Sequence, residues 1–592
     1  MQILRDILLG ETSEEKPEPK LGLALSGGGF RAAFFHVGVL ARMAEVGLLP
    51  RVEVISTVSG GSIVGALYYL CLKRRLESMP EGGIGRDGYL ELVAEVEALL
   101  RRGAQRNIRT RTFANPLKNA KMVLSPRYSR SDRIGDLYDR YIYKDAWAEQ
   151  RERRWKGHGP ELPVALRELK IAPRCDPVED PAAYNESHDE KLPILLLNAT
   201  SLNSGHNWRF EAVRMGESLP VDEHRAEIAN SVDKSMRLLP GYFDPCRGWP
   251  QVPPAKREFP LAKAVAASAA VPGVFQPLPI SGMYEGIRVQ LVDGGVQDNQ
   301  GLQGLLDSGC DRLIVSDASG QMPDREHPSA RLLGVLTRSA SIEGDRIRDE
   351  QLVELLDDDE RERALVHLRL GLDGRAIPPG SAPPRAEAKA DGATADFGVD
   401  AGAQDALSHI RTDLDFFSDT EASALELDAY LMSGRTLEAS SLAGEEVAAR
   451  EHPGWAFRAG ELEDRMRRGD PRLVSALEAG KHKFLRWLAR LPAPARWAIR
   501  GAALVALAAI VVAFILHRDL FDTNLSTDVA LPAVVAALIL LVFYLANPRS
   551  PIIRALLTPP LFLVALPLAG LAALAAIPVF VYVTVSGWVR RA

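Results

Sequence analysis

Three short apolar runs in this 592-residue chain each end in a glycine turn that carries a polar side chain. Apolar runs of this length, rich in β-branched residues, predict buried strands. A tight turn directly after such a strand exposes the next side chain at the end of a sheet, where a ligand can reach it. The three pairs are Leu21–Leu25 before Gly27–Gly29, Val52–Thr57 before Ser59, and Val289–Val292 before Asp293.

The surrounding sequence alternates such runs with amphipathic segments, which is typical of an α/β layer fold. Helices are expected over Ala33–Val46 and Gly61–Leu76. Further strands are expected at Pro193–Thr200 and Arg312–Asp317. A later stretch, Ala406–Gly434, predicts two more helices.

Composition narrows the class of protein. The chain is 46% hydrophobic and 25% charged, and its net charge of -6 gives no overall signature of nucleic-acid binding. Its four cysteines are far apart and lack the spacing of a zinc site or a disulfide framework. The N-terminus lacks the apolar core and cleavage site of a signal peptide, so we expect the bulk of the chain in the cytosol.

Ser59 is the candidate nucleophile. The run from Thr57 to Gly61 follows the pattern G-x-S-x-G, with threonine at the first position. Small residues on both sides of such a serine let strand and helix approach across a strained turn. Thr57 departs from the pattern because it is β-branched. The alternative is a serine that merely caps a helix.

Asp293 is the candidate base. A serine hydroxyl is a poor nucleophile until a base takes its proton. No histidine of the chain stands in an obvious triad context. Asp293 opens the sequence D-G-G with Gly294 and Gly295. The alternative is an aspartate that only shapes a turn.

The glycine run is the candidate oxyanion hole. Gly27, Gly28 and Gly29, between a strand and a helix, can direct backbone N–H groups at one point, and the amide of Gly60 is a further candidate. The alternative is a phosphate cradle, but neither G-x-G-x-x-G nor G-x-x-x-x-G-K-[ST] is present.

Together these motifs resemble the patatin-like phospholipase family. The resemblance rests on G-G-G-F-R-A at Gly27–Ala32, the Ser59 and Asp293 turns, Asn198–Gly205 and Ala267–Phe275. It spans about residues 21–317.

The resemblance implies an α/β three-layer sandwich around a mostly parallel sheet. It also implies a dyad in which Asp293 bonds directly to Ser59, with no metal and no cofactor. The positions that match the family as supporting residues are Arg31, Gly61, Gly294 and Gly295. Arg31 is expected to hold the glycine loop, and His36 to pack rather than to catalyse.

The C-terminal hundred residues contain three apolar blocks, Gly501–Leu516, Val529–Ala546 and Leu561–Val585. Because a membrane helix needs about 20 apolar residues, we expect two or three transmembrane helices. Basic residues before the first block place the globular part on the cytosolic side by the positive-inside rule. The expected organisation is a tail at 1–20, a catalytic domain at 21–450 with a disordered loop at 374–398, a charged helical linker at 451–495 and a membrane domain at 496–592.

The sequence therefore predicts a membrane-anchored serine lipid acyl hydrolase of the phospholipase A or lysophospholipase class. Its expected partners are acyl glycerolipids and the bilayer of a bacterial cytoplasmic membrane. The basic stretch Arg101–Arg111 is expected to be a solvated face or to lie against anionic headgroups. The main alternative is an inactive lipid-binding or scaffold protein, and a nucleotide-binding membrane enzyme is a third.

Overall fold

The computed structural model describes most of the chain up to Lys481, and the chain divides into two units. The first unit comprises residues 1–112 and 120–481, and the second comprises 113–119 and 482–592. The account below concerns the first unit. The described residues are 19–78, 83–114, 128–148, 163–173, 180–217, 237–244, 250–319, 327–330, 332–357, 361–368, 397–440 and 455–481, with isolated positions at 118, 121, 178 and 442.

A ten-stranded sheet forms the centre of the described part of the chain, in the order β10-β9-β1-β2-β3-β4-β5-β6, with β7 and β8 branching from β3. The strands from β10 to β3 pair in parallel, whereas the others pair antiparallel. Their bounds are β1 Leu21–Leu25, β2 Val52–Val58, β3 Ile194–Ser201, β4 Asn207–Phe210, β5 Arg214–Glu217, β6 Gly241–Tyr242, β7 Leu278–Tyr284, β8 Ile287–Asp293, β9 Arg312–Asp317 and β10 Glu362–His367.

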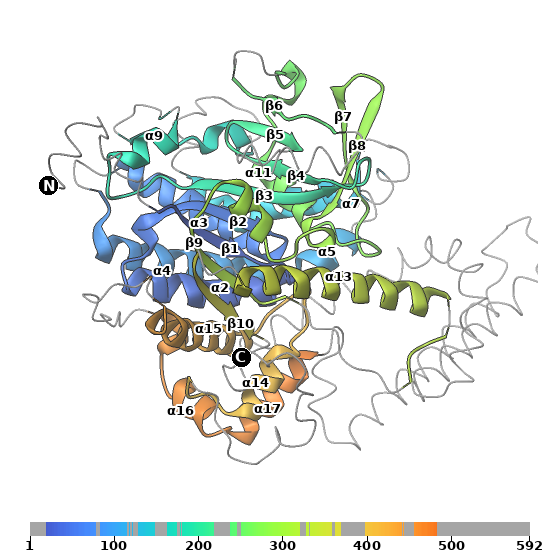
Figure 1. Cartoon of the computed structure of the whole chain (residues 1–592). Coiled ribbons are helices and arrows are strands. Elements are labelled where there is room, and N and C mark those ends of the chain that lie inside the picture. Colours follow the sequence, from blue (N-terminus) through green and yellow to red (C-terminus); the bar gives the residue numbers. More distant parts are fainter. Residues whose placement is uncertain are drawn as a thin grey trace, which may run out of the picture. The chain divides into compact units, whose positions relative to one another are not determined.

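Helices cover both faces of the parallel strands (Figure 1). On one face α2 packs against α3, α4 and α15, and Leu25 of β1 points toward α3. On the other face Ala24 joins a core cluster with residues of α12 and α13. Since successive side chains of a strand point to opposite faces, the sheet is buried on both sides. The α-helical bounds are α2 Gly29–Glu45, α3 Gly60–Ser78, α4 Gly85–Ala104, α5 Ile108–Ala114, α7 Arg130–Tyr138, α9 Pro181–Glu186, α11 Leu261–Ser268, α12 Leu302–Asp307, α13 Leu332–Asp357, α14 Ala401–Ser408, α15 Asp419–Glu438, α16 Leu462–Arg467 and α17 Pro471–Glu478.

Two strands that run in opposite directions meet along one edge of β3. Val58, the last residue of β2, pairs with Asn198, and Asp293, the last residue of β8, pairs with the next residue, Ala199. β4 pairs with residues 197–200 of the same strand and therefore occupies its other edge. The ends of β2 and β8 consequently face each other across a short gap. This arrangement brings two turns together that are more than 200 residues apart in the sequence.

The expected α/β architecture with a parallel centre is confirmed. The helices predicted at 33–46 and 61–76 are α2 and α3, and the predicted strands at 193–200 and 312–317 are β3 and β9. Of the two helices predicted within 406–434, α15 is present, whereas α14 ends at Ser408 and overlaps only the start of that range. Each helix near a glycine turn begins earlier than predicted, because the glycines themselves form its first turn.

The expected linker at 451–495 does not begin where the sequence suggested. Residues 455–481 belong to the same compact unit as the sheet. Trp455 is buried, and its indole N–H donates to Glu45 of α2 at 3.0 Å. The backbone of Gly480 accepts from the amide of Arg411. The packed unit therefore extends to Lys481, and the remainder of that segment lies outside the described residues.

Two arginines of the basic stretch at 101–111 are paired with acids, whereas Arg102 and Arg106 are exposed. Arg101 pairs with Glu97 at 3.0 Å and also with Glu426 of α15. Arg109 pairs with Asp413 at 3.2 Å and with Asp415 at 2.7 Å. The ion pairs of Arg101 and Arg109 therefore join α4 and α5 to the segment around α15.

Within the described residues, no helix combines the length and the apolar character needed to span a bilayer. The three apolar blocks predicted as membrane helices lie outside the described residues, as do the tail at 1–18 and residues 374–396 of the predicted loop.

Candidate active site

Ser59 sits on a strained turn between β2 and α3. Its φ angle is +49°, which places a non-glycine residue in the left-handed region. Such strain persists only where the surrounding structure enforces it, and it is typical of a nucleophile at a strand-to-helix turn. Gly61 permits the turn, because a Cβ atom there would lie 2.1 Å from the carbonyl oxygen of Leu25. The serine is therefore held by close contact between β1 and α3.

A chain of hydroxyl groups fixes the backbone of this turn. The Ser59 N–H donates to the Ser268 hydroxyl at 2.9 Å, which lies 2.8 Å from the Ser62 hydroxyl. The Ser62 hydroxyl lies 2.9 Å from that of Thr57, which donates to the carbonyl oxygen of Leu196. Since each hydroxyl has one proton, the donors run from Ser268 through Ser62 to Thr57. Every member is buried and satisfied.

Thr57, the departure from the G-x-S-x-G pattern, fits because of a glycine in the facing helix. A Cβ atom at Gly65 of α3 would lie 2.6 Å from the Thr57 methyl group. The missing side chain of Gly65 thus leaves room for the threonine. Its hydroxyl joins the network described above, so the β-branched residue is accommodated on both sides.

Asp293 ends β8 beside this turn. Its carboxylate accepts the N–H of Gly295 at 2.8 Å, and its own N–H donates to the carbonyl oxygen of Ala270 at 3.0 Å. Burial raises its pKa to about 6, and hydrogen bonds from Gly295 and from the Ser59 side chain act in the opposite direction. Gly294 is also constrained, since a Cβ atom there would lie 2.5 Å from the Asn198 carbonyl oxygen. The structure thus brings Ser59 and Asp293 together.

In the glycine loop after β1, one of the predicted oxyanion donors is already occupied. The N–H of Gly27 donates to the Asn299 carbonyl oxygen at 2.9 Å, so it is already used. In the part of the chain that the structure describes, the amides of Gly28, Gly29 and Gly60 have no such partner. Gly28 and Gly29 have φ angles of +139° and +60°, which a side chain would disfavour. Three of the four predicted donors therefore remain at the N-terminal ends of α2 and α3.

Arg31 joins this loop to other parts of the chain. Its guanidinium donates to the carbonyl oxygens of Ser408 at 2.9 Å and Ile410 at 3.0 Å. It also donates to the carbonyl oxygens of Ala318, at 2.9 Å, and Ser319. Burial lowers its pKa to about 10, against the opposing charge of Asp317. The fork of one side chain thus joins α2 to two distant segments.

His36 is engaged in the core and does not face the dyad. Its Nε2 lies 3.0 Å from the Ser26 carbonyl oxygen, and its Nδ1 lies 2.7 Å from the Ser316 hydroxyl. The carbonyl requires a proton on Nε2, so Nδ1 accepts from the serine. Burial lowers the pKa of His36 to about 4. The residue links β1, α2 and β9 as a neutral ring.

The sequence analysis gave no role to several residues of the site. Ser268, the acceptor for the Ser59 amide, lies in the segment Ala267–Phe275 that carried part of the family resemblance. Asn299 contributes its carbonyl to Gly27, and its side chain lies against Gly27 and Gly295. The only available signal was position within a matching segment, because their partners are remote in the chain.

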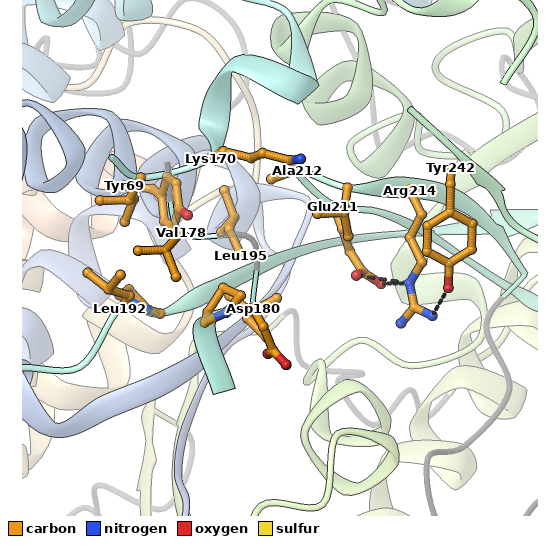
Figure 2. Close-up of a pocket in the computed structure, with 15 residues that line it drawn as sticks. Tyr69, Lys170, Val178, Asp180, Leu192, Leu195, Glu211, Ala212, Arg214 and Tyr242 are labelled. Carbon is orange, nitrogen blue, oxygen red and sulfur yellow. Dashed lines mark hydrogen bonds and ion pairs between the residues drawn. The ribbon is translucent and has the colours of Figure 1, made fainter. Parts of the chain in front are cut away.

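A cavity of about 240 Å³ lies at the other end of β3. Figure 2 shows Tyr69, Val178, Leu192 and Leu195 grouped on one side, and the Glu211–Arg214 ion pair with Tyr242 on the other. Leu195 and Ala199 are four residues apart on the strand, or roughly 13 Å. The cavity is therefore separate from the Ser59–Asp293 pair.

The fold and this geometry place the protein in the class of α/β proteins that carry a serine on a strained strand-to-helix turn. The family model described as patatin-like phospholipase matches residues 23–82 and 180–306, which include both Ser59 and Asp293. The matched part of the chain is therefore patatin-like, as its motifs predicted.

Comparison with curated proteins found no match, whereas several solved structures are similar. Human GIVD cytosolic phospholipase A2, in complex with methyl γ-linolenyl fluorophosphonate and terbium chloride, is 14% identical with a TM-score of 0.34. That match covers 74% of this chain and 61% of the human one. VipD from Legionella pneumophila is 12% identical with a TM-score of 0.26, and the match covers 95% of this chain and 88% of VipD. This chain thus spans about three fifths of the human enzyme, and at these TM-scores the likeness supports no further conclusion.

Proposed function

We propose that the protein hydrolyses acyl esters of glycerolipids through a Ser59–Asp293 dyad and an acyl-enzyme, as a phospholipase A or lysophospholipase. The observation that supports this function best is the meeting of a strained Ser59 with a buried Asp293 at neighbouring positions along β3. An aspartate whose pKa is raised to about 6 is a stronger base than an ordinary carboxylate, while it remains mostly ionised at neutral pH.

In the first half of the reaction, the Ser59 oxygen attacks the ester carbonyl carbon and Asp293 takes the hydroxyl proton. The amides of Gly28, Gly29 and Gly60 donate to the resulting oxyanion. When the intermediate collapses, the bond to the alcohol breaks and Asp293 returns the proton to the departing oxygen. In the second half, Asp293 takes a proton from the water that attacks the acyl carbon. The bond from that carbon to the Ser59 oxygen then breaks, and Asp293 returns the proton to this oxygen as the fatty acid leaves.

We further propose that the protein is anchored in a membrane by its C-terminal apolar blocks, with the hydrolase unit on the cytosolic side. The support is the length of the blocks Val529–Ala546 and Leu561–Val585 and the basic residues before Gly501. An anchored hydrolase acts on lipid that is already concentrated near it. This gives a physical reason for joining such a segment to an acyl hydrolase.

The dyad is tested by Ser59→Ala and Asp293→Asn in the full chain. We expect each variant to lose at least about a thousandfold in ester hydrolysis, because each removes one half of the proton-transfer pair. Release of fatty acid from a panel of phospholipids and lysophospholipids measures activity and reveals the headgroup and acyl position. Reaction with a fluorophosphonate probe measures nucleophilicity and should vanish in Ser59→Ala. Activity near wild type in either folded variant would exclude this dyad.

His36→Asn is the matched control. It changes a buried polar residue near the site whose hydrogen bonds go to Ser26 and Ser316. We expect measurable turnover from this variant. Its complete loss in a folded protein would favour a histidine-based mechanism. A wild-type protein that binds lipid vesicles but neither labels nor hydrolyses would instead be the inactive lipid-binding protein.

A further inference from the structure

Asn299 is a half-buried residue at which the three motifs of the candidate site meet. Its side-chain oxygen Oδ1 lies 2.3 Å from the position that a Cβ atom at Gly27 would occupy, and the Cβ atom of Ser59 lies 3.3 Å from the same position. The same oxygen lies 2.4 Å from the corresponding position at Gly295, and the Oδ1 atom of Asp293 lies 3.0 Å from it. The carboxamide therefore adjoins the glycine loop, the nucleophile turn and the turn that carries the base.

The backbone around Asn299 is held by its two buried neighbours in the chain. The Asp298 carboxylate accepts the N–H of Gly301 at 2.9 Å. On the other side of Asn299, the Gln300 amide donates to the Asp317 carboxylate of β9 at 3.1 Å. Both neighbours are thus fixed in the core, and Asn299 is the member of this short run that reaches the site.

Two contacts of Asn299 join the glycine loop to the turn after β8. Its backbone carbonyl oxygen accepts the N–H of Gly27 at 2.9 Å. Its side-chain oxygen fills the space that the missing side chains of Gly27 and Gly295 leave open. The separation of the two segments therefore depends on the side chain that lies between them.

The neutral carboxamide suits a position beside Asp293. The pKa of Asp293 is shifted by burial and by hydrogen bonds from Gly295 and the Ser59 side chain, and no charged side chain of the described residues is among these causes. An aspartate has almost the same shape as an asparagine, but a second carboxylate would favour the protonated form of Asp293. Asparagine thus fills the space and leaves the base ionised at neutral pH.

We propose that Asn299 is a positioning residue, whose side chain sets the distance between the glycine loop that receives the oxyanion and the turn that carries Asp293. The inference rests on the proposed function. The side chain acts through its neighbours, because it keeps the amides of Gly28 and Gly29 and the carboxylate of Asp293 in place around the same bound ester. A misplacement of about 1 Å in such a geometry can cost about a hundredfold in rate.

Asn299→Ala in the full chain removes the side chain and keeps the backbone carbonyl that accepts from Gly27. We expect kcat for a p-nitrophenyl ester to fall at least about tenfold while KM stays within about twofold. The reason is that the geometry of the reaction changes, whereas the binding of the ester does not. Urea unfolding and circular dichroism show whether the variant is folded.

Asn299→Asp keeps the shape of the side chain and adds a charge. We expect the plateau of kcat/KM to stay within about threefold of wild type, whereas its rise with pH should lie about one pH unit higher, because the new carboxylate raises the pKa of Asp293. A loss of stability alone would not move this rise. Asn203→Asp is the matched control and should keep the wild-type profile. It makes the same change at an exposed residue after β3, whose side chain bonds to the backbone of Arg288 and Gln290.

Two results would overturn the role of Asn299 and leave the dyad standing. One is a wild-type kcat in folded Asn299→Ala, and the other is a wild-type pH profile in Asn299→Asp. If Asn299→Ala does not fold, the pH profile of Asn299→Asp decides alone. A wild-type protein that neither labels with a fluorophosphonate nor hydrolyses the ester would overturn the proposed function, and the role of Asn299 with it.

Discussion

At the scale of single residues, burial makes Asp293 a stronger base and also makes it costly to the fold. Its pKa is about 6 in the folded protein, against 3.8 for an ordinary aspartate. A raised pKa means that the folded state binds the proton more tightly than the unfolded state does. Stability therefore falls as the pH rises from about 4 to 6, and at neutral pH the ionised carboxylate costs roughly 3 kcal/mol. The strained φ angle of Ser59 adds to this cost.

The raised pKa predicts the pH dependence of hydrolysis. Asp293 accepts a proton only when it is ionised, so kcat/KM should rise about tenfold per pH unit below pH 6 and level off near pH 7. An ordinary aspartate would give full activity from about pH 5. Hydrolysis of a p-nitrophenyl ester at fixed time points between pH 4 and 8, corrected for its spontaneous hydrolysis, provides the measurement. A profile that is flat down to pH 5 would contradict the raised pKa of Asp293.

At the scale of secondary-structure elements, the first turn of α2 depends on segments far along the chain. The N–H of Phe30 donates to the carbonyl oxygen of Asp413 at 3.1 Å, and Gly29 packs against Thr412 and Asp413. The Arg31 guanidinium donates hydrogen bonds to four backbone carbonyl oxygens, which belong to residues 318–319 and 408–410. The conformation of the candidate oxyanion loop therefore depends on contacts with these distant segments, as well as on its own glycines.

Arg31→Lys is expected to destabilise the protein by roughly 2–3 kcal/mol, because an ammonium cannot reach the four buried carbonyls that the planar guanidinium satisfies. Urea unfolding measures this loss, and kcat/KM should fall with it as the loop loses its shape. Arg346→Lys, the same change in a largely exposed ion pair with Glu350, is the control and should stay within about 0.5 kcal/mol. Equal stability of the two variants would contradict the role of Arg31.

These elements also show what the sequence reveals and what it does not. β9 was predicted at its observed bounds and β3 within one residue, because a buried strand between turns has a local pattern. The pairing of Ser59 with Asp293 followed from motifs, but the opposed ends of β2 and β8 that produce it are a matter of topology. The hydrogen bonds of Gly27 to Asn299 and of Arg31 to residues 408–410 join segments with no common local pattern. They could not be predicted from either segment alone.

At the scale of the whole molecule, attachment to the membrane is predicted to be separable from catalysis. The full chain should remain in the membrane pellet after carbonate washing, whereas a chain that ends after Lys481 should be extracted. The shorter chain should still label with a fluorophosphonate probe, because Ser59 and Asp293 both lie within the unit that ends at Lys481. Its activity on a soluble ester should survive, while its activity on bilayer lipid should fall.

Two results would contradict this view of the molecule. A folded shorter chain without labelling would mean that residues after Lys481 help to build the site. A shorter chain that resists carbonate extraction would place the anchor elsewhere.

The contacts of Arg31 and Phe30 with residues 408–413 also bear on how the protein is made. A ribosome adds roughly 5–20 residues per second, so on the order of a minute can separate the emergence of Ser59 from that of Ile410. Until that segment emerges, the glycine loop lacks the backbone that gives it shape. A nascent chain therefore carries its nucleophile for most of its synthesis without a finished oxyanion hole. The glycine loop would thus reach its final shape only when the globular part of the chain is nearly complete.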